Sequence, residues 1–185
     1  EHLDALLHAC ERSHQPSRNT ALVAVLAGSG LRAAELLSLT VSQGESLANG
    51  GPVLIVGKGS KRRLAVLSPA GQAALKGYLC WRAVGDPNAP LWLNAYVHPL
   101  TYGGLHWLLD ELGKAAGISV TRKGGEVRPG MLAHVLRHTF ASRLLNAGVN
   151  VKILQVALGH ASPITTIATY CHSTPSQLQA AVASL

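Results

Sequence analysis

The sequence contains few acidic residues, and two long stretches of it contain none. Asp and Glu total 9 residues against 16 Lys and Arg, which gives a formal net charge of +7. No acidic residue occurs in residues 46–85 or 127–185, although Lys and Arg occur in both segments. A surface without acids has a positive potential that attracts polyanions, nucleic acid first among them. The charge distribution is consistent with a nucleic-acid partner, but a basic, well-solvated surface accounts for it equally well.

Cysteine, aromatic residues and long apolar runs are also scarce. Cys10, Cys80 and Cys171 form neither a CxxC pair nor an even set, so we interpret them as packing thiols of a reducing compartment. No apolar run approaches the ~18 residues of a membrane span, and the first residues lack the pattern of a signal peptide. Aromatic residues make up 4% and hydrophobic residues 48%, with much Ala and Leu, which favours a soluble, mainly helical protein of one domain.

Apolar periodicity predicts helices along most of the chain. The first is an amphipathic helix, because four apolar residues follow the i, i+3, i+4, i+7 rule: Leu3, Leu6, Leu7 and Cys10. Pro16 and Ser17 interrupt it. Further helices are predicted at residues 19–27, 31–39, 69–84, around 105–112, in the segment that begins near 132, and at 151–158 and 177–185.

The middle of the chain, residues 41–67, is predicted to be β structure. Gly and Pro punctuate this segment, and its clearest β-rich runs are residues 53–56 and 64–67. Between them, residues 57–61 read Gly-Lys-Gly-Ser-Lys, which has the composition of a hairpin tip. Residues 119–129 are rich in Gly, Lys and Arg, and we predict a basic loop or a short hairpin there.

The segment from His134 to Tyr170 carries the densest group of reactive side chains. His134, Arg137 and His138 are spaced i, i+3 and i+4, so a helix places all three on one face. Apolar residues spaced four apart can hold another face against a core: Leu132, Leu136, Phe140 and Leu144. An arginine among histidines suits a phosphate better than a metal dication. Tyr170 is then a potential nucleophile for that phosphate.

Five short motifs follow one another between residues 18 and 175. They are Gly30-Leu31-Arg32-x-x-Glu35-Leu36, Val56-Gly57-Lys58-Gly59-x-Lys61-x-Arg63, His134-x-x-Arg137-His138, Leu158-Gly159-His160 and Thr165-Thr166…Tyr170-x-His172. Each motif alone arises by chance in many proteins. The five together, in this order and spacing, resemble the tyrosine recombinase, or phage-type integrase, family.

The resemblance implies a site-specific DNA recombinase that cleaves and rejoins strands through a 3′-phosphotyrosyl intermediate. Its catalytic residues would be Arg32, Lys58, His134, Arg137, His160 and Tyr170. Glu35 would orient a neighbouring side chain, and His138 would be a buried, hydrogen-bonded histidine in a supporting role. The expected DNA contacts are basic residues at or next to the predicted hairpin tip and in the segment 119–129: Lys61, Arg62, Arg63, Arg122, Lys123 and Arg128.

The chemistry agrees with these residue types. A phosphodiester attacked by a hydroxyl gains charge on its non-bridging oxygens, and the guanidiniums of Arg32 and Arg137 can bind such oxygens in pairs. Ionising a free tyrosine at pH 7 costs ~4 kcal/mol, so His134 is expected to accept the proton of Tyr170. Lys58 would protonate the leaving 5′-oxygen, and His160 would donate a hydrogen bond to a phosphate oxygen. This scheme requires no metal and no nucleotide cofactor.

The resemblance also implies the architecture and the partners. We expect an α+β, mainly helical catalytic domain over residues 1–175, with a small antiparallel sheet that bears Lys58, and a helical tail at 176–185. Relatives carry a separate N-terminal domain, which we do not expect within this chain. The expected partner is double-stranded DNA, bound by a homotetramer that forms from monomers, with no membrane partner. The expected location is the bacterial cytoplasm, at the nucleoid.

Other functions could use parts of the same pattern. A type IB topoisomerase nicks and reseals DNA with a similar set of residues, and a non-catalytic relative would only bind DNA. A zinc hydrolase could use His134, His138 and His160, although no Glu base lies between the first two histidines and Arg137 would repel the metal.

Each of the main residues has a purely structural alternative as well. Arg32 could be an arginine at a helix start, paired with Glu35. Lys58 could be a solvated turn lysine, and Tyr170 could be a core tyrosine at a helix end. The functional interpretation depends on all of the motifs occurring together.

Overall fold

The computed structural model describes residues 2–57, 62–82, 85–121 and 127–159. Its helices are α1 (His2–Glu11), α2 (Pro16–Ser29), α3 (Ala33–Leu37), α4 (Val41–Ala48), α5 (Pro69–Trp81), α6 (Tyr102–Ala115), α7 (Ala133–Asn146) and α8 (Val151–Leu158). Its strands are β1 (Val53–Val56), β2 (Arg62–Ala65), β3 (Ser119–Thr121) and β4 (Val127–Pro129), in two antiparallel hairpins. The mainly helical fold class predicted from the sequence is therefore confirmed. None of the described helices is long and apolar enough to cross a membrane.

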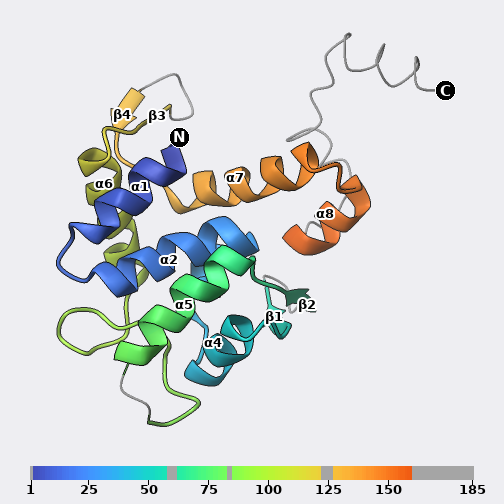
Figure 1. Ribbon diagram of the computed structural model, residues 1–185, viewed down its shortest axis with the longest axis horizontal. Coiled ribbons are helices and arrows are strands. Elements are labelled where there is room, and N and C mark those ends of the chain that lie inside the picture. Colours follow the sequence, from blue (N-terminus) through green and yellow to red (C-terminus); the bar gives the residue numbers. More distant parts are fainter. Residues whose placement is uncertain (1, 58–61, 83–84, 122–126, 160–185) are drawn as a thin grey trace.

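Helix α2 is the centre of the main core. Nearly all of its second half, residues 21–29, is buried, and α2 packs against α1, α5 and α7. Figure 1 shows α2 running between α1 and α5, with its C-terminal end directed toward α8. The helix begins at Pro16, three residues earlier than the sequence prediction, because proline suits the first turn of a helix, where its missing N–H is not needed.

Residues 41–48 form helix α4 rather than the predicted β structure. The Thr40 hydroxyl accepts a hydrogen bond from the Gln43 N–H at 3.3 Å, and the Gln43 side chain accepts one from the Thr40 N–H at 3.0 Å. This reciprocal capping satisfies two of the N–H groups that a helix start leaves free. The predicted hairpin does follow, as β1 and β2, with Val53 paired to Ala65 and Ile55 to Arg63.

The C-terminal part of the described chain is a pair of helices, α7 and α8, that extends to one side of the core (Figure 1). The start of α7 belongs to the main core through Ala133 and Leu136. Its second half packs on α8 around a separate small cluster, formed by Ala141, Leu154 and Leu158. α8 ends at Gly159, as the sequence predicts. Helix α7 thus links the main core at its start to the cluster with α8 in its second half.

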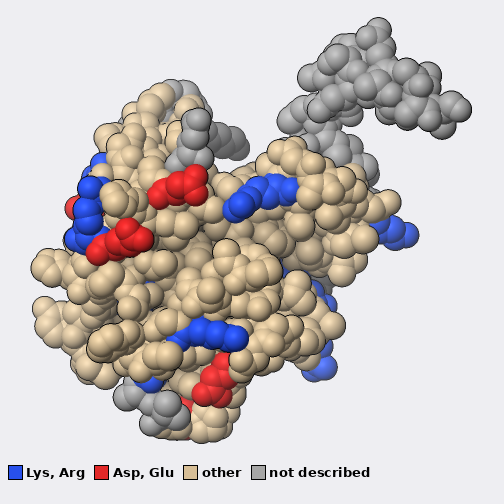
Figure 2. Space-filling model, in the orientation of Figure 1, with Lys and Arg blue, Asp and Glu red and all other residues tan. Residues whose placement is uncertain are grey.

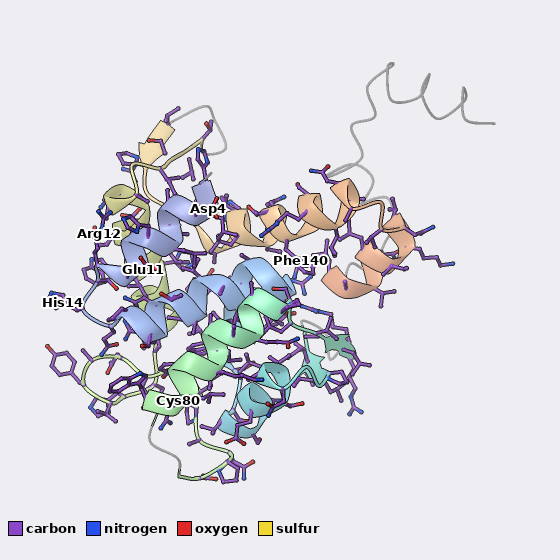
Figure 3. The ribbon with its side chains drawn as sticks, viewed as in Figure 1. Asp4, Glu11, Arg12, His14, Cys80 and Phe140 are labelled. Carbon is purple, nitrogen blue, oxygen red and sulfur yellow. The ribbon has the colours of Figure 1, made fainter. Side chains whose placement is uncertain are left out.

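The cysteines differ from one another in environment. Cys10 is buried in the core, where burial raises the pKa of its thiol to about 12. Cys80, on α5, is exposed, so the prediction that it packs in the interior is wrong (Figure 3). Its position on the outer face of a helix explains the difference. Cys171 lies outside the described residues.

Candidate active site

The first arginine motif forms the junction between α2 and α3. Gly30 ends α2 in the left-handed conformation, with φ of +62°. A Cβ at this position would lie 2.4 Å from the Phe140 ring, which reaches across from α7, so only glycine fits (Figure 3). Leu31 is fully buried next to it. This anchoring places Arg32 at the N-cap position, immediately before α3, with its side chain 41% exposed.

Glu35 is a buried carboxylate that receives three donors. Its side chain is 5% exposed. It accepts hydrogen bonds from the Arg32 backbone N–H at 2.8 Å, from Nη1 of Arg32 at 2.8 Å and from Nη2 of Arg63 at 2.7 Å. Burial by itself raises the pKa of Glu35, but the Arg32 backbone N–H and the Arg63 charge outweigh it, so the pKa is lowered. Glu35 is therefore a fixed anion between two arginines.

Arg137 joins three helices from a buried position. It lies on α7, where only 8% of the residue is exposed. Its Nη1 donates to the carbonyl oxygen of Gly30 at 2.6 Å, and its Nη2 donates to the carbonyl oxygen of Leu158. The guanidinium thus bridges the end of α2 and the end of α8, which its rigid, forked shape allows.

Arg63 is buried too, which differs from the expected role as an exposed DNA contact. Its side chain is 7% exposed. Nη2 binds Glu35 at 2.7 Å, and Nη1 donates to the carbonyl oxygen of Ala157 at 2.7 Å. The β1–β2 hairpin is therefore tied through Arg63 to both α3 and α8. The sequence placed Arg63 in the second motif but did not show that it is buried, because strand alternation alone does not say which face of a short hairpin packs inward.

Three arginines, which we call the arginine cluster (Arg32, Arg63 and Arg137), meet at the last turn of α8. They donate to three consecutive carbonyl oxygens: Arg63 to Ala157, Arg137 to Leu158, and Arg32 to Gly159 at 3.4 Å. These carbonyls lack partners within the helix, and the helix end carries about half a negative charge. Together with the Glu35 carboxylate, that partial charge only partly neutralises three guanidiniums. A positive site remains, and Arg32 is its most exposed member.

His134 and His138 lie one helical turn apart on α7, and both are exposed. Their rings meet edge to face, with centroids 6.1 Å apart. The expectation that His138 is buried is therefore wrong, because the face of α7 that it shares with His134 turns toward solvent. Partial burial, together with the neighbouring His134 and Arg137, nevertheless lowers the pKa of His138. Arg137 is thus buried and the two histidines are exposed, although their spacing predicted that all three share one face.

The described ranges hold no group of three or more His, Cys, Asp or Glu residues arranged to bind a metal ion. The zinc alternative needs His160 as a third ligand, and His160 lies outside the described residues. Five other predicted site residues lie outside them as well: Lys58, Lys61, Arg122, Lys123 and Tyr170.

Arg62 and Arg128 are both exposed, on different hairpins. Figure 1 shows that these hairpins, β1–β2 and β3–β4, lie on opposite sides of the molecule. Only Arg62, on β2, adjoins the arginine cluster in the chain. On the face drawn in Figure 2, Lys and Arg but no Asp or Glu are visible over α8 and the β1–β2 hairpin. On this face, the surface over α8 and the β1–β2 hairpin is therefore basic.

Comparison with known proteins identifies relatives over nearly the whole chain. A sequence model of the phage integrase family matches residues 1–177. Tyrosine recombinase XerC of Lacticaseibacillus casei (strain BL23) is 33% identical over 168 residues, which cover 88% of this chain and 52% of the relative. Tyrosine recombinase XerD of Caulobacter vibrioides is 38% identical over 168 residues, covering 86% of this chain and 51% of the relative. The chain thus spans about half the length of these relatives.

Solved structures share the fold. The crystal structure of XerA recombinase is 27% identical and superposes with a TM-score of 0.77, covering 99% of this chain and 62% of that one. The XerH site-specific recombinase bound to its difH substrate, in a pre-cleavage complex, is 28% identical with a TM-score of 0.71, covering 98% and 52%. The catalytic domain of bacteriophage HP1 integrase is 26% identical with a TM-score of 0.64, covering 98% and 89%.

Proposed function

The chain belongs to the phage integrase family of tyrosine recombinases, and we propose that it is the catalytic part of a site-specific DNA recombinase. It cleaves a DNA strand by attack of Tyr170 on a phosphodiester, and it rejoins strands by the reverse reaction. The observation that carries this proposal is the meeting of Arg32 and Arg137 at the end of α8. These residues are far apart in sequence, yet they donate to the adjacent carbonyl oxygens of Gly159 and Leu158.

The arginine cluster suits the transition state of a phosphoryl transfer. Charge accumulates on the non-bridging oxygens as the fifth oxygen approaches phosphorus, and guanidiniums held in place beforehand stabilise it without reorganising. Arg137 is held by two carbonyls and Arg32 by Glu35, so both are oriented before DNA binds. Each guanidinium has five N–H donors, which is enough to keep these bonds and add contacts to phosphate.

The proposed reaction exchanges one phosphodiester for another. The phenol oxygen of Tyr170 forms a bond to phosphorus, its proton passes to His134, and the bond from phosphorus to the 5′-oxygen breaks. Lys58 gives that oxygen a proton, and His160 donates a hydrogen bond to a non-bridging oxygen. Attack by a 5′-hydroxyl on the phosphotyrosine reverses each step. Because the bond energy is conserved in the tyrosine ester, the cycle needs no nucleotide.

The partners and the assembly are part of the same proposal. Double-stranded DNA is the substrate, supported by the basic surface over α8 and the β1–β2 hairpin (Figure 2) and by the XerH complex with difH. We infer that residues 1–175 are the catalytic domain and 176–185 a tail. Four copies acting on two duplexes would exchange the strands, in the bacterial cytoplasm at the nucleoid.

Trapping of covalent protein–DNA adducts tests the proposal. On a nicked suicide duplex, the short 5′-hydroxyl fragment diffuses away after cleavage, so the adduct accumulates and is resolved on a denaturing gel. We expect the wild-type chain to form it and Tyr170→Phe to form none while still binding DNA, since only the phenol oxygen is lost. An adduct that persists in Tyr170→Phe would contradict the assignment of the nucleophile. Relaxation of supercoils without strand exchange between two sites would indicate a topoisomerase instead.

A further inference from the structure

Arg63 differs from its neighbours on the β1–β2 hairpin. Arg62 and Leu64 are exposed, whereas the Arg63 side chain is 7% exposed and is directed away from solvent. Its Cδ and Nε pack over Gly159, where a Cβ would come within 2.6 Å and 3.0 Å of them. Gly159 has φ of +62°, so its backbone both ends α8 and makes room for the arginine.

The contacts of Arg63 connect two other elements of the site. Nη2 binds Oε2 of Glu35 at 2.7 Å, and Nη1 binds the Ala157 carbonyl oxygen at 2.7 Å. Oε2 of Glu35 also accepts the Arg32 backbone N–H, while Oε1 binds Nη1 of Arg32. Without Arg63, the Glu35 carboxylate would keep donors from Arg32 alone and could rotate with it.

We propose that Arg63 is a positioning residue for Arg32. It fixes the Glu35 carboxylate, which in turn orients the Arg32 guanidinium, and it ties that pair to the last turn of α8. This inference rests on the proposed function. It goes beyond it, because Arg63 reaches the reaction only through Glu35 and touches no reacting atom.

Burial supports this role over a DNA contact or a general stabilising one. A buried arginine needs several partners, yet Nε of Arg63 is buried with no hydrogen-bond partner in the described part of the chain. Leaving one donor unsatisfied is unfavourable, so stability alone is a poor reason for an arginine here. The exposed Arg32 side chain, in contrast, benefits, because Arg63 prevents the Glu35 carboxylate from turning away from Arg32.

The test compares single-turnover cleavage at saturating suicide duplex, the dissociation constant for DNA and the thermal midpoint of unfolding. The variants are Arg63→Ala, Arg63→Lys, Glu35→Gln and the double variant Arg63→Ala/Glu35→Gln. Arg18→Ala is the matched control, because Arg18 is a partly buried arginine that likewise donates to a distant carbonyl, that of Leu93 at 2.9 Å, away from the arginine cluster.

We expect Arg63→Ala to slow cleavage roughly ten- to hundredfold, since a small displacement of a catalytic group costs this much. Its dissociation constant for DNA should stay near the wild-type value. Arg63→Lys should recover part of the rate, because one ammonium reaches Glu35 or Ala157 but not both. The double variant should be no slower than the slower single variant to within about twofold, because both changes act through the same pair. Arg18→Ala should lower the thermal midpoint and leave cleavage intact.

Three results would overturn the proposal. A weaker affinity with an unchanged rate at saturation would make Arg63 a DNA contact. If the rate losses of the two single variants multiply in the double variant, Arg63 and Glu35 would affect cleavage independently. If Arg18→Ala slows cleavage as much as Arg63→Ala does, at an equal loss of stability, the effect of Arg63→Ala would be general destabilisation. If Arg63→Ala does not fold, Arg63→Lys with the same cycle decides between these outcomes. Absence of any wild-type adduct would instead refute the proposed function, before the variants are compared.

Discussion

Replacing Arg137 by Lys separates the geometry of the arginine from its charge. In the structure the guanidinium bridges the Gly30 and Leu158 carbonyl oxygens, which belong to different helices. An ammonium on a flexible stem can bind one of them but cannot span both. One buried carbonyl then loses a charged donor, which costs about 2 kcal/mol. For a chain of this length the midpoint of thermal unfolding should fall by roughly 4–8 °C.

The effect on cleavage should be larger than the effect on stability suggests. A lysine held by a single carbonyl cannot present two parallel N–H groups to a phosphate, and losing such a donor set costs roughly 3 kcal/mol of transition-state stabilisation. Single-turnover cleavage of a suicide duplex should therefore slow by about a hundredfold or more. It should be measured well below the unfolding midpoint of the variant.

Arg143→Lys is the control for this experiment. Arg143 lies on the same helix, but it is exposed, so the change should alter neither the midpoint nor the rate. Near-normal cleavage by Arg137→Lys would show that a positive charge is sufficient at this position. An unchanged midpoint would show that the bridge between the two helices contributes nothing to stability. Either result would refute the reasoning.

Three further predictions follow from the same site. The pKa of Glu35 is lowered from 4.5, so its charge stabilises the folded state above that pH, and this stabilisation is lost as pH falls through the folded pKa. The free energy of unfolding should therefore fall more steeply with acidification for the wild type than for Glu35→Gln. Equal slopes would contradict the assignment. Gly159→Ala and Gly148→Ala both place a side chain at positive φ, so each should lower the free energy of unfolding, measured with denaturant, by about 1–3 kcal/mol. Only Gly159→Ala should also slow cleavage, because only at Gly159 would the added Cβ clash with Arg63. Lys58→Ala should slow cleavage of ordinary DNA far more than of a 5′-bridging phosphorothiolate, since sulfur leaves without a proton; equal impairment would remove Lys58 from the role of acid.

Local sequence signals predicted most of the elements but missed one helix and misjudged several boundaries. α8 and its end at Gly159 follow from apolar spacing and a terminal glycine. Helix α4 was missed because Gly and Asn around it suggested turns, although Thr40 and Gln43 carry a capping signal. The start of α2 was misjudged because Pro16 was interpreted as a break after α1 rather than as the first residue of α2.

Burial was the property that the motifs could not predict. The spacing of His134, Arg137 and His138 indicates a shared helical face, but the structure buries the arginine and exposes both histidines. The difference arises because the ends of α2 and α8 converge over Arg137 and offer it two carbonyls. Neither end is near Arg137 in the sequence, so no local pattern records the contact.

The sequence by itself determined the family motifs, the helical class and the identity of the residues proposed for catalysis, because these depend on residue types at fixed spacings. Only the tertiary structure decided how the arginines are used. Arg63, which we expected to contact DNA, is buried against Glu35 and Ala157. The physical reason is that unpaired carbonyls at a helix end and a buried carboxylate attract guanidiniums from any part of the chain that folding brings within reach. Packing between segments that are distant in the sequence decides which arginines reach the end of α8 and the Glu35 carboxylate.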